Sequence, residues 1–275
     1  RVLSGEKGIA LFAEKEKLDM DSDRILATPR YTAYLRVADG CDNCCTYCTI
    51  PSIRGHFRSR TMESVLDEAN RLAKRGVREL VVIAQDTTRY GEDIYGKPML
   101  ATLLSELCKI EGLHWIRTLY TYPDRITDEL LEVIASEEKC VKYLDIPIQH
   151  CNSDILKKMN RRGDGDFLRA LFAKLRDRIP GLVLRTSVIT GLPGETEKEF
   201  EELCRFLKEQ RLERVGAFPF SPEEGTPAAT MEFVDNEIAQ SRAQMVESIQ
   251  SRIMDDYNAS MMGKIMDVLV DGFDE

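Results

Sequence analysis

The sequence predicts an α/β protein whose core is a partial (βα)6 parallel barrel of the TIM-like type. Short runs rich in β-branched residues alternate along the chain with amphipathic helical stretches. Connections long enough to hold a helix join parallel strands, and six such strands favour a sheet that curls into an incomplete barrel. A flat, doubly wound sheet is the alternative. In either fold we expect function at the carboxyl ends of the strands, where the loops converge.

The expected strands share β-branched and aromatic residues, and the expected helices share apolar residues at helical spacing. The strands are expected over 34–38, 80–84, 115–120, 143–148, 183–190 and 214–220. The main helices between them are expected over 62–74, 100–108, 128–136, 165–177 and 198–210.

Four regions are expected along the chain. Residues 1–33 are charged and poorly periodic, which is typical of a linker or an extension from a preceding domain. The barrel core is expected over 34–230, and a long closing helix over 231–262, because its helical periodicity from residue 236 is uninterrupted by Gly or Pro. Residues 263–275 are expected to begin a further domain, with 265–270 as its first strand.

Composition and charge narrow the functional class. The 275 residues are 43% hydrophobic and 31% charged, and no stretch approaches the ~20 apolar residues of a membrane span. An apolar signal core is also missing, so we expect a cytoplasmic protein with no membrane partner. The net charge of -9 makes nucleic acid an unlikely partner and favours a basic one. In a reducing compartment the eight cysteines are expected to be metal ligands or buried thiols, with Cys108, Cys140 and Cys204 as buried thiols.

Half of the cysteines lie within eight residues, at positions 41, 44, 45 and 48. The C-x3-C-x2-C pattern of Cys41, Cys45 and Cys48 offers three thiolates, one fewer than a 4Fe-4S cluster needs to fill every iron. One iron would then stay open to a ligand. A zinc site built from two C-x2-C pairs, or a redox dithiol, remains an alternative, but zinc sites usually separate the pairs by a dozen or more residues. Cys44 is expected not to be a ligand.

The segment from Cys41 to Cys48, with Tyr47 before the last cysteine, resembles the radical S-adenosylmethionine signature. The resemblance implies that S-adenosylmethionine chelates the open iron and that Tyr47 lies beside its adenine. It also implies that an electron donor protein reduces the cluster, which splits a carbon–sulfur bond of the cofactor to give a 5′-deoxyadenosyl radical. In such enzymes the cofactor supplies the difficult chemistry, and the protein positions it.

Further motifs extend the resemblance to the methylthiotransferases over nearly the whole chain. They are residues 38–41, 50–55, 58–60, 146–150, 159–162 and 191–196. Within that family, residues 85–88 and 120–123 resemble the branch that adds a methylthio group to the β-carbon of an aspartate in a basic protein of the small ribosomal subunit. The branch that modifies adenosine in transfer RNA is the alternative, and a non-catalytic, metal-stabilised binding module is a second one.

The family resemblance also implies a second 4Fe-4S cluster in a preceding domain and a small TRAM-like β domain that begins at residues 263–275. We therefore expect this chain to bind one cluster and to cleave S-adenosylmethionine reductively without completing sulfur insertion.

Several other polar groups are candidates for cofactor binding. Gln85, Gln149 and Arg185 lie near strand ends or would face the barrel lumen, where each needs a partner that a zwitterionic cofactor could supply. Contacts among neighbouring loops are the alternative for each. Gly191 lets the backbone approach a ligand closely, although a simple tight turn explains it equally well. His150 is expected on the functional rim with its hydrogen bonds satisfied. No catalytic side chain can be named from the sequence.

Overall fold

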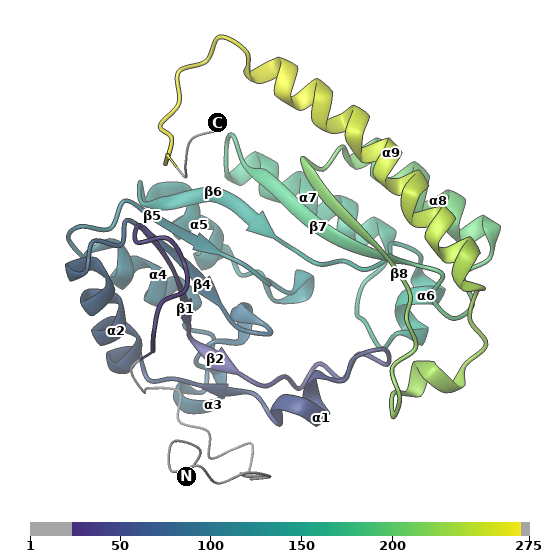
Figure 1. The fold of residues 1–275 in the computed structure, drawn as a ribbon, viewed down its shortest axis with the longest axis horizontal. Helices are drawn as coiled ribbons and strands as arrows, with labels where there is room; N and C mark the ends of the chain where they lie inside the picture. The colour runs from purple at the N-terminus through teal and green to yellow at the C-terminus, as the bar shows by residue number, and fades with distance from the viewer. Residues whose placement is uncertain (1–23, 271–275) are drawn as a thin grey trace, which may run out of the picture.

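Six parallel strands form the central sheet of the computed structural model, which describes residues 24–270 (Figure 1). Each strand pairs in parallel with the next, in the order β1-β4-β5-β6-β7-β8. Because each crossover moves one place in the same direction, the sheet curls without reversing, which confirms the predicted partial barrel over the doubly wound alternative. The strands are β1 Thr32–Arg36, β4 Glu79–Ile83, β5 Trp115–Thr118, β6 Cys140–Asp145, β7 Val183–Thr190 and β8 Arg214–Pro219.

Five long helices cover the outer face of the sheet (Figure 1). They are α2 Met62–Lys74, α4 Leu100–Cys108, α5 Asp128–Ser136, α7 Gly165–Arg178 and α8 Glu197–Gln210. The first three have the predicted bounds. Side-chain caps fix several of these starts: the hydroxyl of Thr61 accepts the Ser64 backbone N–H, and that of Thr127 accepts the Leu130 N–H.

The hydrophobic core lies between the sheet and these helices. Its largest fully buried side chains include Leu35, Leu80, Leu103, Leu131 and Phe172, and complete burial of each stabilises the fold by roughly 1.5–3 kcal/mol. The predicted buried thiols Cys108, Cys140 and Cys204 also lie in this core.

The opposite face of the sheet is open. Along β7 buried and partly exposed residues alternate, with Leu184 and Val188 packed under the helices while Arg185 and Ser187 face the lumen. The lumen of this barrel is therefore a cavity rather than a packed core.

The long helix α9, Asn236–Met261, packs along β8, β7 and α8 (Figure 1, yellow). It ends one residue before the predicted end of the closing helix. Its buried side includes Ala239, Ala243, Val246 and Ile253. This helix therefore covers the strand at one end of the open sheet.

The prediction of a strand over 265–270 was wrong. Residues 264–270 have no regular secondary structure, and the side chains of Ile265 and Val268 are exposed. A strand needs a neighbour that pairs with its backbone groups, and the described part of the chain supplies none. The expectations for residues 1–23 and 271–275 lie outside the described residues.

The structure also contains short elements that the sequence did not predict. These are the antiparallel pair β2 Ala38–Asp39 and β3 Arg58–Ser59, the helices α1 Ile50–Arg54, α3 Glu92–Tyr95 and α6 Ser153–Lys158, and the 3-10 turns Thr87–Arg89, Pro123–Arg125 and Pro227–Thr230.

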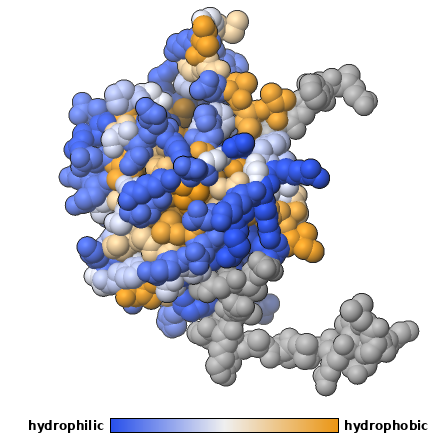
Figure 2. Space-filling model, turned by 90° about the vertical axis from the view of Figure 1, so that its left-hand side faces the viewer, coloured by the Kyte–Doolittle hydropathy of each residue, from blue (hydrophilic) through white to orange (hydrophobic). Residues whose placement is uncertain are grey.

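None of the helices in residues 24–270 combines the length and the apolar composition that a membrane-spanning helix needs. The face shown in Figure 2 mixes hydrophilic side chains with scattered hydrophobic ones.

Candidate active site

The cysteine-rich loop follows β2, at the carboxyl end of the barrel. It begins at Gly40, whose φ of +77° and close approach to the backbone exclude a side chain, because a Cβ there would lie 2.0 Å from the carbonyl oxygen of His56. The N–H of Cys41 donates to the Gly55 carbonyl at 3.2 Å, and Asp42 lies 2.9 Å from the His56 ring. These contacts attach the loop to the segment between α1 and β3.

Three of the four clustered cysteines line one cavity of about 640 Å³. They are Cys41, Cys45 and Cys48, the residues expected to hold a cluster, and all are free thiols. Cys44 is exposed, has a left-handed backbone (φ 51°) and does not line the cavity. The structure therefore separates Cys44 from the other three.

Burial raises the pKa of the Cys41 thiol to about 11, and burial also raises the pKa of Cys48. Both thiols are protonated at neutral pH, so binding of iron would release protons. In residues 24–270, no three His, Cys, Asp or Glu side chains lie close enough together to hold a single metal ion. Three separate thiols on one cavity wall suit a 4Fe-4S cluster, in which three irons would each take one thiolate and the fourth would stay open.

Arg161 is the main site residue that the sequence analysis did not single out. It follows α6 and donates from Nη1 to the Cys45 sulfur at 3.6 Å and to the Tyr47 hydroxyl at 3.3 Å. Its guanidinium lies 4.5 Å from the centroid of the Tyr122 ring, in cation–π contact. Asn160 donates to the Cys44 carbonyl at 2.9 Å, which joins the same turn to the cysteine loop. The sequence indicated Arg161 only as part of the motif at residues 159–162, which extends the family resemblance.

Gln85, Gln149 and Arg185 all line this cavity, together with Tyr47. The Oε1 atom of Gln85 is buried and has no hydrogen-bond partner in the described part of the chain. Such an orphaned acceptor is costly unless a ligand supplies a donor. Gln149 has a φ of +69°, held by backbone bonds to Ser187 and Ile189, and strain of this kind is common where a side chain serves a ligand.

Gly191 is not among the residues that line the cavity. Its φ is +78°, and a Cβ there would lie 2.5 Å from the Cβ of Ala239 on α9. Its N–H donates to the Glu195 carboxylate at 2.9 Å. The structure thus places Gly191 at a close contact between the β7–α8 turn and α9, and its role in cofactor binding stays a prediction.

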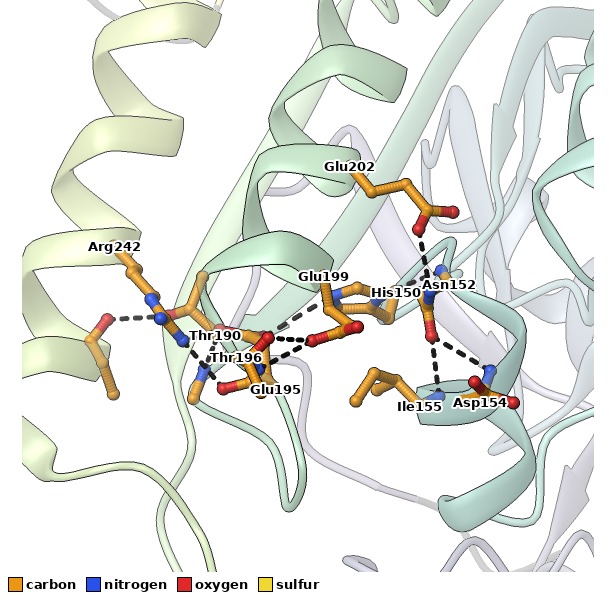
Figure 3. A network of polar contacts seen from close by, with 12 residues as sticks. His150, Asn152, Asp154, Ile155, Thr190, Glu195, Thr196, Glu199, Glu202 and Arg242 are labelled. Carbon is orange, nitrogen blue, oxygen red and sulfur yellow. Dashed lines mark hydrogen bonds and ion pairs between the residues drawn. The ribbon is translucent and has the colours of Figure 1, made fainter.

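His150 is fully buried and not on an open rim (Figure 3). Its Nδ1 accepts the Asn152 N–H at 2.9 Å, which leaves the ring proton on Nε2, 3.5 Å from the Glu195 carboxylate. Arg242 of α9 donates to the other carboxylate oxygen of Glu195 at 2.7 Å. This buried network ties α9 to the ends of β6 and β7, next to Gln149.

The basic residues that follow the cysteine loop, at positions 54, 58 and 60, do not line the cavity. Arg54 is exposed, whereas Arg60 is buried and paired with Glu68 of α2. The pair of Arg60 with Glu68 attaches the segment after the loop to α2.

The comparisons with known proteins agree with this geometry. The profile of the radical SAM superfamily matches residues 35–207. Ribosomal protein uS12 methylthiotransferase RimO of Clostridium botulinum (strain Okra / Type B1) is 48% identical over 273 residues, which cover 99% of this chain and 61% of that protein. The RimO of Pelotomaculum thermopropionicum is 49% identical over 273 residues, with 99% and 62% covered. The chain therefore spans about three-fifths of the length of these relatives.

Solved structures with low sequence identity share the fold. Coproporphyrinogen III oxidase (HemN) from Escherichia coli, a radical SAM enzyme, superposes with a TM-score of 0.62 at 16% identity, over 82% of this chain and 54% of that one. The radical S-adenosylmethionine methyltransferase TsrM from Kitasatospora setae, with cobalamin and a [4Fe-4S] cluster bound, gives 0.60 at 17% identity, over 72% and 38%.

Proposed function

Because this chain belongs to the radical SAM superfamily, we propose that it is the catalytic barrel of a methylthiotransferase that modifies the β-carbon of an aspartate in ribosomal protein uS12. One observation carries the proposal: three free cysteines share the wall of a cavity at the carboxyl ends of the strands. The 48–49% identity to RimO relatives supports this reaction and this substrate. Such an enzyme would act in the cytoplasm, on a protein of the ribosome.

Cys41, Cys45 and Cys48 would hold a 4Fe-4S cluster, and S-adenosylmethionine would occupy the cavity beside it. When both are bound, they supply one-electron cleavage of a carbon–sulfur bond and a 5′-deoxyadenosyl radical. Gln85 and Gln149 offer amide donors and acceptors to the polar parts of the cofactor, and Tyr47 offers a ring face. Arg161 places a guanidinium group 3.6 Å from the Cys45 sulfur, at the end of the cavity where the cluster would bind.

The second cluster and the small β domain that the family resemblance implies remain predictions, as does the identity of the electron donor protein. The described residues do not test them. The expectation that this chain cleaves the cofactor but does not complete sulfur insertion also stays a prediction.

Hydrogen transfer tests the proposal without requiring sulfur insertion. The reconstituted chain is reduced with dithionite in the presence of S-adenosylmethionine and uS12 whose aspartates carry deuterium on the β-carbon. We expect 5′-deoxyadenosine that contains deuterium, detected by mass spectrometry.

Unlabelled 5′-deoxyadenosine with uS12 would contradict the proposed substrate. Labelled product from deuterated transfer RNA in place of uS12 would assign the chain to the other branch. Absence of 5′-deoxyadenosine altogether would contradict radical chemistry.

A further inference from the structure

The wall of the cavity carries cationic side chains although the protein is acidic. The whole chain carries 47 Asp and Glu residues against 38 Lys and Arg residues. Among the described residues, the side chains that line the cavity include three arginines, Arg36, Arg161 and Arg185, and no carboxylate. A concave site with charge of one sign concentrates ligands of the opposite sign. The cavity is therefore built for an anionic group.

Arg161 belongs to the cluster end of this cavity. Its guanidinium contacts the Cys45 sulfur, the Tyr47 hydroxyl and the ring of Tyr122, and it also donates to the Pro147 carbonyl. These contacts use most of its donors and hold its charge beside the Cys45 sulfur. The other two arginines remain to be explained.

Arg185 lies deeper in the barrel. It stands on β7 opposite Asp145 of β6, five residues before β7 ends at Thr190. Its Nη1 donates to the buried Asp145 carboxylate at 2.6 Å, and that carboxylate also accepts the Tyr120 N–H at 3.1 Å. The ion pair fixes one side of the guanidinium, while the side chain stays 35% exposed to the cavity.

Arg36 approaches the same cavity from β1, the strand at the other end of the sheet. Its side chain is 39% exposed, and the nearest carboxylate, that of Asp39, lies 3.9 Å away. This separation is too long for a hydrogen bond. Arg36 therefore offers donors to the cavity that its own surroundings leave largely unused.

We infer that Arg36 and Arg185 form a subsite for the carboxylate of the substrate side chain. The inference rests on the proposed function, in which the reacting carbon is the β-carbon of an aspartate. That carbon is bonded directly to the carboxyl group, so guanidinium groups that hold the carboxylate also fix the position of the reacting hydrogens. Arg185 would then bind the substrate, whereas the sequence suggested that it binds the cofactor.

Small probes test the subsite directly. The chain, reconstituted with its cluster and saturated with S-adenosylmethionine, is titrated with N-acetyl-L-aspartate N-methylamide and with the matching asparagine compound, and binding is followed by NMR. We expect the aspartyl probe to bind about tenfold more tightly, since a hydrogen bond between a guanidinium and a carboxylate is stronger than one to a neutral amide. Arg36→Gln and Arg185→Gln should each reduce this preference. Arg71→Gln, which removes an exposed charge from α2, should leave it unchanged.

Three outcomes would overturn the subsite. The first is equal binding of the two probes by the unmodified chain. The second is weaker binding of S-adenosylmethionine by Arg185→Gln, to the same extent as the aspartyl probe, which would assign Arg185 to the cofactor. The third is binding of dimethyl phosphate as tight as that of the aspartyl probe, which would mean that the cavity binds any anion.

A failure of the proposed function gives a different result. In that case uS12 transfers no deuterium to 5′-deoxyadenosine, whereas the aspartyl preference and its loss in Arg36→Gln and Arg185→Gln persist. Circular dichroism and chemical unfolding of each variant show whether the fold is retained.

Discussion

The buried ion pair between Arg242 and Glu195 allows a quantitative prediction about the attachment of α9. Arg242 is 8% exposed and Glu195 is 2% exposed, and their charged atoms lie 2.7 Å apart. The substitution Arg242→Gln leaves the Glu195 carboxylate buried without its cation. Loss of one partner from a buried pair costs about 3–5 kcal/mol. We expect the lower end of this range, because the Gly191 N–H still donates to the carboxylate.

The chain offers a matched control on the same helix. Arg211 pairs with Asp256 of α9 at the same 2.7 Å, but these side chains are 53% and 68% exposed. Exposed pairs are screened by water and contribute roughly 0.2–1 kcal/mol, so Arg211→Gln should cost no more than that. The two ion pairs have the same charge separation and differ in burial, and Arg242 additionally lies 3.1 Å from the exposed Glu197 carboxylate and 5.0 Å from the centroid of the Phe200 ring.

Urea unfolding followed by circular dichroism measures both free energies of unfolding. The double variant Glu195→Gln, Arg242→Gln should be more stable than Arg242→Gln alone, because it buries no unpaired charge. Equal losses in Arg242→Gln and Arg211→Gln, or no recovery in the double variant, would refute the reasoning.

Three further predictions concern the site and its surroundings. Cys45→Ser should lose bound iron after anaerobic reconstitution and keep its fold, whereas Cys44→Ser should retain the iron; global unfolding of Cys45→Ser would instead indicate a purely structural site. Gly191→Ala should destabilise the fold by about 2–4 kcal/mol in urea unfolding, because it adds a clash with α9 to a left-handed backbone. The control Gly181→Ala has the same left-handed backbone but no described neighbour within 4 Å, so it should cost only about 1–2 kcal/mol. Equal losses of stability in the two variants would contradict the assigned clash. Gln85→Leu should weaken binding of S-adenosylmethionine about tenfold by calorimetry without loss of stability, because it removes an orphaned buried acceptor; unchanged affinity would show that this amide does not serve the cofactor.

The sequence predicted the helices better than the polar contacts of the site. The bounds of α2, α4 and α5 follow from periodicity and from caps such as Thr61 and Thr127, which are local features. Arg161 contacts Tyr47, 114 residues earlier, and no local pattern indicates such a contact. Arg242 was missed for the same reason, since its role depends on where α9 packs.

One sequence expectation failed because it depended on distant neighbours. Residues 265–270 have the composition of a strand, but strand formation needs a pairing partner. The packing of Gly191 against Ala239 of α9 could not be predicted for the same reason, since the two residues are far apart in the sequence. The spacing of the cysteines, in contrast, is a local feature, and the three residues that it picks out share one cavity wall, whereas their role as cluster ligands stays a prediction.

The most direct test of the central claim is the iron and sulfide content of the chain after anaerobic reconstitution and removal of unbound metal. If Cys41, Cys45 and Cys48 hold a 4Fe-4S cluster, each chain should contain about four irons and about four sulfides. One zinc per chain with no iron or sulfide would contradict the account.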